Sequence, residues 1–270
     1  MPHLLLNNGV SIPQIGFGLW RNTDEQECKN SIKWALTTGY RHFDDAQVYD
    51  NEQHLGAAIK ESAVPRSDLF ITTKISRANM WGTEVIPSFR ESLKKLQMDY
   101  VDLLLLHFPV TECRDMSWRR LEEIYKAGEA KAIGVSNYTV KHLQQMKAKF
   151  KVTPAVNQVE MSIALQQPEL VEYCRKEGII VEAYTPLAEG VFLKNPIIEQ
   201  IAKKYDKTTA QVMLRWCIDY GVVVLTKSSN KERIKENFDI FDFKLDNSDM
   251  SKLRTLDSGF RTNWDPTYIA

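Results

Sequence analysis

The chain has 270 residues, 43% of them hydrophobic and 26% charged, which is typical of a water-soluble folded protein. Its 35 basic residues balance 35 acidic ones, so no basic excess favours binding to nucleic acid or to an anionic membrane. The N-terminal apolar run stops at Leu6 without a basic region before it, and no stretch is as long as a membrane span, so we expect a cytoplasmic protein without a membrane partner.

From the N-terminus, the sequence predicts a β-hairpin over residues 3–15, with Asn8 and Gly9 as a type I′ turn. After it, short apolar runs typical of strands alternate with amphipathic stretches typical of helices. The predicted strands cover residues 15–19, 40–44, 69–74, 100–107, 132–135, 155–159, 179–184 and 222–225. The predicted helices cover residues 23–35, 51–62, 83–96, 117–125, 168–176, 196–205, 210–220 and 230–237, and two more begin at 139 and 247. Capping boxes are predicted at two helix starts, formed by Thr23 with Gln26 and by Ser229 with Glu232.

Alternation of strands with helices, without a second-domain boundary, predicts an α/β fold, a single (β/α)8 TIM barrel over residues 1–270. A doubly wound dinucleotide-binding fold is the alternative. Its glycine fingerprint is incomplete here, because no third glycine follows Gly16 and Gly18. The hairpin precedes the first barrel strand and carries an apolar face, so we expect it to plug the bottom of the barrel.

The four cysteines and five histidines show no pattern typical of a metal site or a disulfide scaffold. The cysteines lie far apart and form no CxxC pair, and the histidines lie on different predicted elements without ligand spacing. We therefore expect reduced, buried thiols and no bound metal. We also expect the chain to be a monomer.

Polar side chains follow neighbouring predicted strands, at the end where barrel enzymes place their active sites. Asp44 ends the second strand and Tyr49 follows it, Lys74 ends the third, and His107 ends the fourth. Each alone could have an ordinary structural role, but adjacent strand ends would bring all four together. A nearby ammonium lowers the pKa of a tyrosine, and a carboxylate keeps a desolvated lysine charged. We therefore predict a proton relay in which Asp44 holds Lys74, Lys74 tunes Tyr49, and Tyr49 donates the proton.

The chain resembles the aldo-keto reductase family over essentially its whole length. The segments that carry the resemblance are, in chain order, FDDAQVYDNE, FITTKI, LLLLHFP, AIGVSN, VNQVE, AYTPLAEG, KTTAQVMLRW and TKSSNKERIKEN. No single segment is decisive, but together they are specific. The chain looks most like the compact members, namely prokaryotic-type 2,5-diketogluconate and methylglyoxal reductases and prostaglandin F synthases.

The resemblance implies that the protein binds NADPH across the barrel mouth and reduces the carbonyl of an aldehyde or ketone by direct hydride transfer. Asp44, Tyr49, Lys74 and His107 match the catalytic tetrad of the family. In these roles Tyr49 is the general acid, and His107 orients the carbonyl oxygen by a hydrogen bond.

The residues expected to bind the cofactor are Ser136, Asn137, Gln158, Tyr184, Leu187, Lys227, Ser228, Arg233 and Asn237. Independently of the resemblance, the hydroxyl and amide groups at the ends of strands five and six suit a carboxamide, and the Tyr184 ring can stack. Lys227 and Arg233 flank a predicted helix start whose free amides suit an anion. The resemblance assigns that anion to the 2′-phosphate and Asn237 to the adenine, so NADPH is expected to be preferred over NADH.

Four aromatic side chains are expected to line a substrate pocket: Trp20, Trp81, Phe108 and Trp264. An aromatic cleft accepts varied apolar carbonyl compounds, so the small-molecule substrate stays open. Several positions depart from the family pattern, among them Phe108 in place of a common Trp and Thr226 in place of a common Pro. Asp45 adds a carboxylate near Lys74, and Glu189 lies in the loop that usually borders the pyrophosphate.

Two other classes of function remain as alternatives. A non-catalytic NADPH-sensing subunit would keep the cofactor residues and bind a partner chain. A metal-dependent or phosphate-handling barrel lyase would need clustered histidine and carboxylate ligands.

Overall fold

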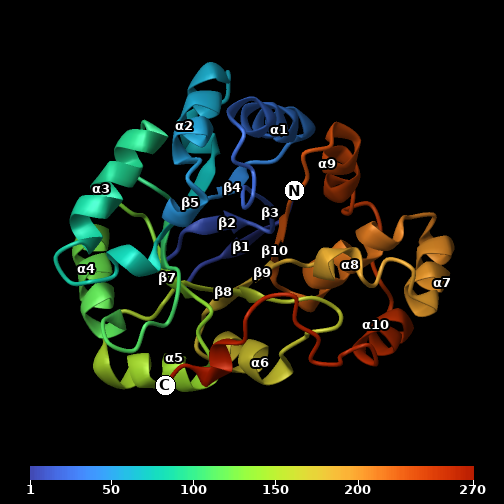
Figure 1. Ribbon diagram of the computed structural model, residues 1–270. Coiled ribbons are helices and arrows are strands. Elements are labelled where there is room, and N and C mark those ends of the chain that lie inside the picture. Colours follow the sequence, from blue (N-terminus) through green and yellow to red (C-terminus); the bar gives the residue numbers. More distant parts are fainter.

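Eight parallel strands form a closed barrel in the computed structural model, which describes residues 1–270 (Figure 1). The barrel strands are β3 (Ile15–Gly18), β4 (His42–Asp44), β5 (Phe70–Ile75), β6 (Leu103–Leu106), β7 (Ile133–Ser136), β8 (Val156–Glu160), β9 (Ile180–Tyr184) and β10 (Val223–Thr226). Each strand pairs with the next one in the chain, and β10 closes the ring by pairing with β3. The predicted TIM barrel is confirmed.

A ring of helices surrounds the strands (Figure 1). The helices are α1 (Glu25–Thr38), α2 (Glu52–Glu61), α3 (Val85–Leu96), α4 (Arg114–Lys126), α5 (Val140–Lys149), α6 (Pro168–Lys176), α7 (Pro196–Tyr205), α8 (Thr209–Tyr220), α9 (Lys231–Phe238) and α10 (Asn247–Arg254). The bounds of α6 and α7 are those predicted from sequence, and each has proline at its first position, where the missing N–H costs nothing. No helix combines the length and the apolar character that crossing a membrane requires.

Both predicted capping boxes are wrong by one residue. At α1 the cap is Asp24, whose carboxylate accepts from the backbone N–H of Glu27 at 2.8 Å. At α9 it is Asn230, whose Oδ1 accepts from the N–H of Arg233 at 3.0 Å. Aspartate is a stronger N-cap than the threonine before it, whereas asparagine and serine are about equal, so the ranking explains the cap of α1 but not that of α9.

An N-terminal hairpin, β1 (His3–Leu5) with β2 (Ser11–Pro13), precedes the barrel. Its turn is not type I′, because that turn needs two residues with positive φ and only Gly9 has one, at 87°. Instead the N–H of Leu6 donates to the carbonyl of Val10 at 2.8 Å, which closes a longer loop. Asn8 is then free to donate its side-chain amide to the carbonyl of Lys131, at 2.9 Å.

The hairpin lies across one opening of the barrel (Figure 1). Its Leu6 and Ile12 are buried in a small apolar cluster that is separate from the main core. The barrel contributes to that cluster the first residues of several strands, including Phe70 of β5 and Leu103 of β6. The hairpin therefore plugs the end of the barrel where the strands begin, as predicted, and leaves the opposite mouth for the site.

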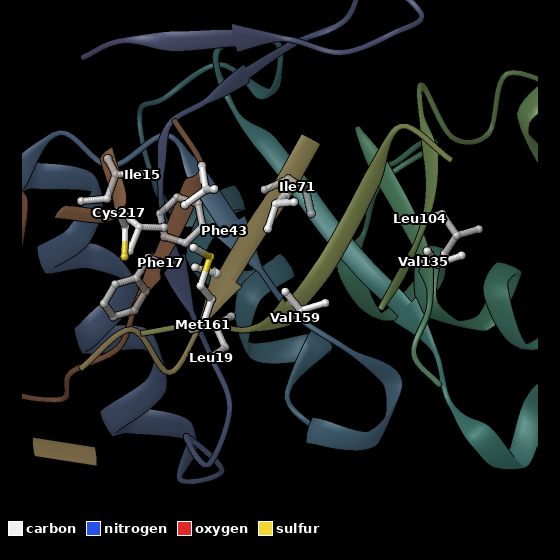
Figure 2. Packing of buried hydrophobic residues seen from close by; sticks show 14 of the residues in the cluster. Ile15, Phe17, Leu19, Phe43, Ile71, Leu104, Val135, Val159, Met161 and Cys217 are labelled. Carbon is white, nitrogen blue, oxygen red and sulfur yellow. The ribbon is translucent and has the colours of Figure 1, made fainter. Parts of the chain in front are cut away.

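The main hydrophobic core lies between the strands and the helices around them. Ile15, Phe17 and Phe43 belong to it together with Cys217 of α8 (Figure 2). Phe17 and Phe43 meet edge-on, with 6.2 Å between ring centroids. Because side chains alternate along a strand, packing Phe43 toward the helices turns His42 and Asp44 into the barrel.

Gly16 makes room for the polar side chains inside the barrel. A Cβ at Gly16 would lie 2.6 Å from Cδ2 of Leu225 and 2.7 Å from Nδ1 of His42. His42 is completely buried, so it cannot retreat to solvent. Interior packing thus explains the glycine at position 16 without a dinucleotide-binding loop.

We expect Gly16→Ala to lower the free energy of unfolding by about 1–3 kcal/mol, because the added methyl overpacks the barrel interior. Gly18→Ala is the matched control, since its Cβ would meet only the carbonyl of Thr226 at 3.6 Å. Urea unfolding of both variants measures the difference. Equal losses for the two variants would contradict the packing argument.

Candidate active site

Asp44 and Lys74 form a buried ion pair at the C-terminal ends of β4 and β5. Lys74 Nζ donates to Asp44 Oδ1 at 2.6 Å and to the backbone carbonyl of Asp45 at 2.9 Å. Burial works against the charged lysine, but the carboxylate of Asp44 outweighs it and raises the pKa of Lys74 above its usual value. Lys74 is therefore an ammonium at neutral pH.

Tyr49 lies in the 3-10 turn Gln47–Tyr49 after β4, and its hydroxyl lies 3.4 Å from Lys74 Nζ. Neighbouring elements hold this turn in place. The side-chain oxygen of Gln47 accepts from the backbone N–H of Ser76 at 2.8 Å, which ties the turn to the end of β5. The phenol is thus fixed beside the lysine by contacts between two strand ends.

The pKa of Tyr49 moves in the opposite direction from the predicted one. Burial raises it to about 12, although the charge of Lys74 acts to lower it. The expectation of a net decrease is wrong, because the loss of hydration outweighs the neighbouring cation. At neutral pH Tyr49 is a protonated phenol, which is the form that can donate a proton.

His107 follows β6 and faces Tyr49 edge-on, with 5.8 Å between ring centroids. Its other neighbour is Phe108, which stacks on the imidazole at 4.5 Å. Burial, and then the charge of Lys74, lower the pKa of His107 well below its usual value. The imidazole is therefore neutral and can act as a hydrogen-bonding group without adding a second cation to the site.

Asp45 points into the protein interior and is completely buried. One carboxyl oxygen accepts from the N–H of Ala46 at 2.8 Å, and the other has no hydrogen-bond partner. Burial, and then the charge of Glu52, raise the pKa of Asp45 well above its usual value. Burial thus works against ionisation of Asp45, and Asp44 is the carboxylate whose oxygen accepts from Lys74.

Ser136, Asn137 and Tyr184 gather on the opposite side of the mouth. Asn137 accepts from the hydroxyl of Tyr184 at 2.8 Å and donates to Ser136 Oγ and to the carbonyl of His107, both at 3.1 Å. It has a left-handed backbone, with φ of 65°, which asparagine tolerates better than most residues. The structure therefore brings these predicted cofactor residues together and links them to the histidine.

Gln158 of β8 connects this group to the ion pair. Its side-chain nitrogen donates to Asp44 Oδ2 at 2.8 Å and to Glu182 Oε2 at 2.6 Å. Both amide hydrogens are thus used inside the protein. Only the side-chain oxygen of Gln158 is left for a ligand.

A basic edge lies beyond the end of β10. Lys227 and Arg233 are both exposed there, and neither forms an ion pair with a carboxylate. Ser228 is buried between them and accepts from the backbone N–H of Asn230 at 3.1 Å. Asn237 is buried further along α9, and Leu187, after β9, packs partly against the core.

Two of the four predicted pocket aromatics lie together. Phe108 and Trp264 are 5.7 Å apart and line a cavity of about 460 Å³ with the C-terminal residues Tyr268 to Ala270. Trp20 and Trp81 do not line this cavity. Trp20 stacks under the guanidinium of Arg21, at 4.1 Å, and Trp81 is largely exposed.

The sequence did not predict the partners of three acidic residues: Glu160, Glu182 and Glu189. Gln158 is the partner of Glu182. Glu160 accepts from the backbone N–H of Thr262 at 2.6 Å, which holds the C-terminal segment over the mouth. Glu189 pairs with Arg21, with 3.9 Å between Oε1 and Nη1. Glu182 is completely buried. The sequence did carry a signal for Glu182, because a charged residue within the otherwise apolar strand IVEAY indicates a buried polar contact.

All four cysteines are buried and free, and none forms a disulfide. No group of three or more histidine, cysteine, aspartate or glutamate side chains is arranged to hold a metal ion.

The geometry can be compared with known proteins. The family model described as "Aldo/keto reductase family" matches residues 14–258. The chain belongs to the aldo/keto reductase family. It is 43% identical to glyoxal reductase of Bacillus subtilis, over 97% of this chain and 95% of that protein. The resemblance predicted from the sequence is confirmed.

Two solved structures of the family are similar over nearly their whole length. An aldo-keto reductase from a Medee basin deep-sea metagenome library has a TM-score of 0.96 and 40% identity, and the match covers 99% of both chains. A Bombyx mori aldo-keto reductase in complex with NADP has a TM-score of 0.94 and 32% identity, over 100% of this chain and 99% of that one.

We expect Lys74→Met to destabilise this reductase by about 3–5 kcal/mol, because it leaves the buried Asp44 carboxylate without a counterion. Adding Asp44→Asn should restore most of the loss, since the double variant buries no unpaired charge. Urea unfolding of the wild type, both single variants and the double variant measures the coupling. Additive losses would show that the two side chains do not act as a pair.

Proposed function

We propose that this protein is an NADPH-dependent reductase of aldehydes or ketones in which Tyr49 is the general acid. The observation that carries the proposal is the position of Lys74 Nζ, 2.6 Å from a carboxylate oxygen of Asp44 and 3.4 Å from the hydroxyl of Tyr49. These groups lie at the barrel mouth of a chain that belongs to the aldo/keto reductase family.

Tyr49 supplies the proton that a carbonyl oxygen needs as it becomes an alcohol. Its high pKa keeps the phenol protonated until a negative charge develops on the substrate oxygen beside it. The ammonium of Lys74, next to the hydroxyl, then stabilises the phenolate that forms. Asp44 keeps that ammonium charged throughout.

His107 positions the substrate oxygen next to Tyr49. The neutral imidazole can donate one hydrogen bond to the substrate oxygen. That hydrogen bond becomes stronger as negative charge develops on the oxygen. The carbonyl of His107 accepts from Asn137, and its ring stacks on Phe108, so the imidazole has little freedom to turn away.

The residues present fit a nicotinamide dinucleotide phosphate. When bound, NADPH supplies the hydride that reduces the carbonyl carbon. The side-chain oxygen of Gln158, whose nitrogen is already engaged, suits the N–H of a carboxamide, and the ring of Tyr184 suits stacking. Lys227 and Arg233, which lack carboxylate partners, suit a 2′-phosphate, and the family resemblance adds Ser228 to that site and Asn237 as the residue that would hold the adenine. Leu187, in the loop after β9, is a further proposed cofactor contact.

The substrate class we favour is a small carbonyl compound. A relative of this chain is named glyoxal reductase, and the 460 Å³ cavity beside Phe108 and Trp264 offers apolar surface for a larger substituent. The alternative of a non-catalytic NADPH-sensing subunit would not require the proton donor. The first experiment below separates the two.

We expect Tyr49→Phe to lower turnover by at least about 100-fold, because the proton donor is removed. NADPH binding should be retained, since the phenyl ring fills the same space. Oxidation of NADPH with a panel of aldehydes, in the presence of a chelator, measures turnover, and fluorescence titration measures binding. Normal rates in the variant would remove Tyr49 as the acid. No turnover by the wild type would favour the sensing subunit.

We expect Lys227→Ala and Arg233→Ala each to weaken NADPH at least about tenfold while leaving NADH nearly unchanged, because NADH lacks the 2′-phosphate that the charged groups would bind. Dissociation constants for both cofactors test this expectation. Lys231→Ala, a neighbouring exposed lysine on α9, is the control for nonspecific charge. Equal losses for NADPH and NADH would refute the phosphate site.

A further inference from the structure

A group of polar side chains lies inside the barrel, below the ion pair, and takes no part in the reaction proposed above. Glu182 of β9, His42 of β4 and Thr72 of β5 are all completely buried. His42 Nε2 lies 3.5 Å from Glu182 Oε1 and 3.2 Å from Thr72 Oγ1. Burying polar groups destabilises a fold unless they form hydrogen bonds with one another. A functional role would account for keeping three of them inside this barrel.

Gln158 joins this interior group to the site. Its nitrogen bridges two carboxyl groups, Asp44 above and Glu182 on the adjacent strand, at 2.8 and 2.6 Å. Gln158 and Glu182 are also direct partners in the pairing of β8 with β9. Asp44 and Glu182 therefore accept the two hydrogen bonds that the side-chain nitrogen of Gln158 can donate.

This bridge determines which way the amide of Gln158 faces. If the amide turned over, its oxygen would lie against two carboxyl groups, and both hydrogen bonds would be lost. With the nitrogen held by Asp44 and Glu182, the oxygen is the atom left to accept a hydrogen bond. We propose that Glu182 is a positioning residue that holds Gln158 with its oxygen available to the carboxamide of the nicotinamide, an inference that rests on the function proposed above.

The charges inside the barrel agree with this role. The strands carry six ionisable side chains, namely His42 and Asp44 on β4, Lys74 on β5, Glu160 on β8, and Glu182 and Tyr184 on β9. Burial lowers the pKa of His42 to about 3, so the imidazole is neutral and gives Glu182 no cation. Lys74 is already paired with Asp44.

Glu182 therefore lacks a counterion of its own. Burial, and then the carboxylate of Asp44, raise the pKa of Glu182 above its usual value. Glu182 accepts from Gln158 through Oε2, and when it is protonated the proton belongs on Oε1, which faces His42 Nε2. A glutamine at this position would have the same shape and the same acceptor, which makes Glu182→Gln the conservative variant.

The experiment compares two ligands that differ only in the nicotinamide ring. Dissociation constants for NADPH and for 2′-phospho-ADP-ribose are measured by titration for the wild type, Glu182→Met and Glu182→Gln. We expect Glu182→Met to weaken NADPH about tenfold, through the misplaced amide. Binding of 2′-phospho-ADP-ribose should change by less than about twofold, because its contacts lie elsewhere. Glu182→Gln should restore NADPH binding.

Two further variants separate positioning from a general structural role. Glu52→Gln alters another buried glutamate, which accepts from Thr73 Oγ1 at 2.6 Å and does not touch Gln158, so it should change both ligands equally or not at all. Gln158→Leu should reproduce the pattern of Glu182→Met, and the double variant should be no worse than Gln158→Leu alone. If Glu182→Met does not fold, Glu182→Thr makes the same test, because threonine suits a strand and is too short to reach Gln158.

The outcomes separate the two proposals. Equal weakening of NADPH and 2′-phospho-ADP-ribose, or no weakening, in Glu182→Met would overturn the positioning role and leave the proposed function standing. Failure of the wild type to bind NADPH would overturn both. Selective loss of NADPH that Glu182→Gln restores supports the positioning role.

Discussion

One buried ammonium constrains the whole site. Lys74 has no exposed surface, and a lysine in that position keeps its charge only because Asp44 lies 2.6 Å away. That contact requires β4 and β5 to be neighbours and to end at the same level. The closed barrel meets both requirements, since parallel strands bring their C-terminal ends to a single rim.

The other ionisable groups near Lys74 are held neutral. Burial raises the pKa of Tyr49 and so keeps its proton, burial raises the pKa of Asp45 and so opposes its ionisation, and burial lowers the pKa of His107 and so favours the neutral imidazole. The Asp44–Lys74 ion pair therefore has the largely uncharged Tyr49 and His107 as its hydrogen-bonding neighbours. Such a site concentrates the electrostatic effect of Lys74 on the phenol that lies beside it.

Interior polar residues extend this arrangement into the barrel. Gly16 leaves space for His42, His42 lies against Glu182, and Glu182 holds the amide of Gln158. Gln158 in turn donates to Asp44. A run of contacts thus connects the packing at Gly16 with the amide of Gln158 and the ion pair at the mouth.

The sequence alone determined the order of strands and helices, the barrel, the family, and the strand ends that carry Asp44, Lys74, His107 and Gln158. These features follow from local periodicity and from residue types at fixed positions along the chain. Only the tertiary structure decided the direction of the Tyr49 pKa, the burial of Asp45, the pairing of Phe108 with Trp264, and the contact between Gln158 and Glu182. Burial and contacts between distant segments set these properties, and neither can be read from a residue and its neighbours in the chain.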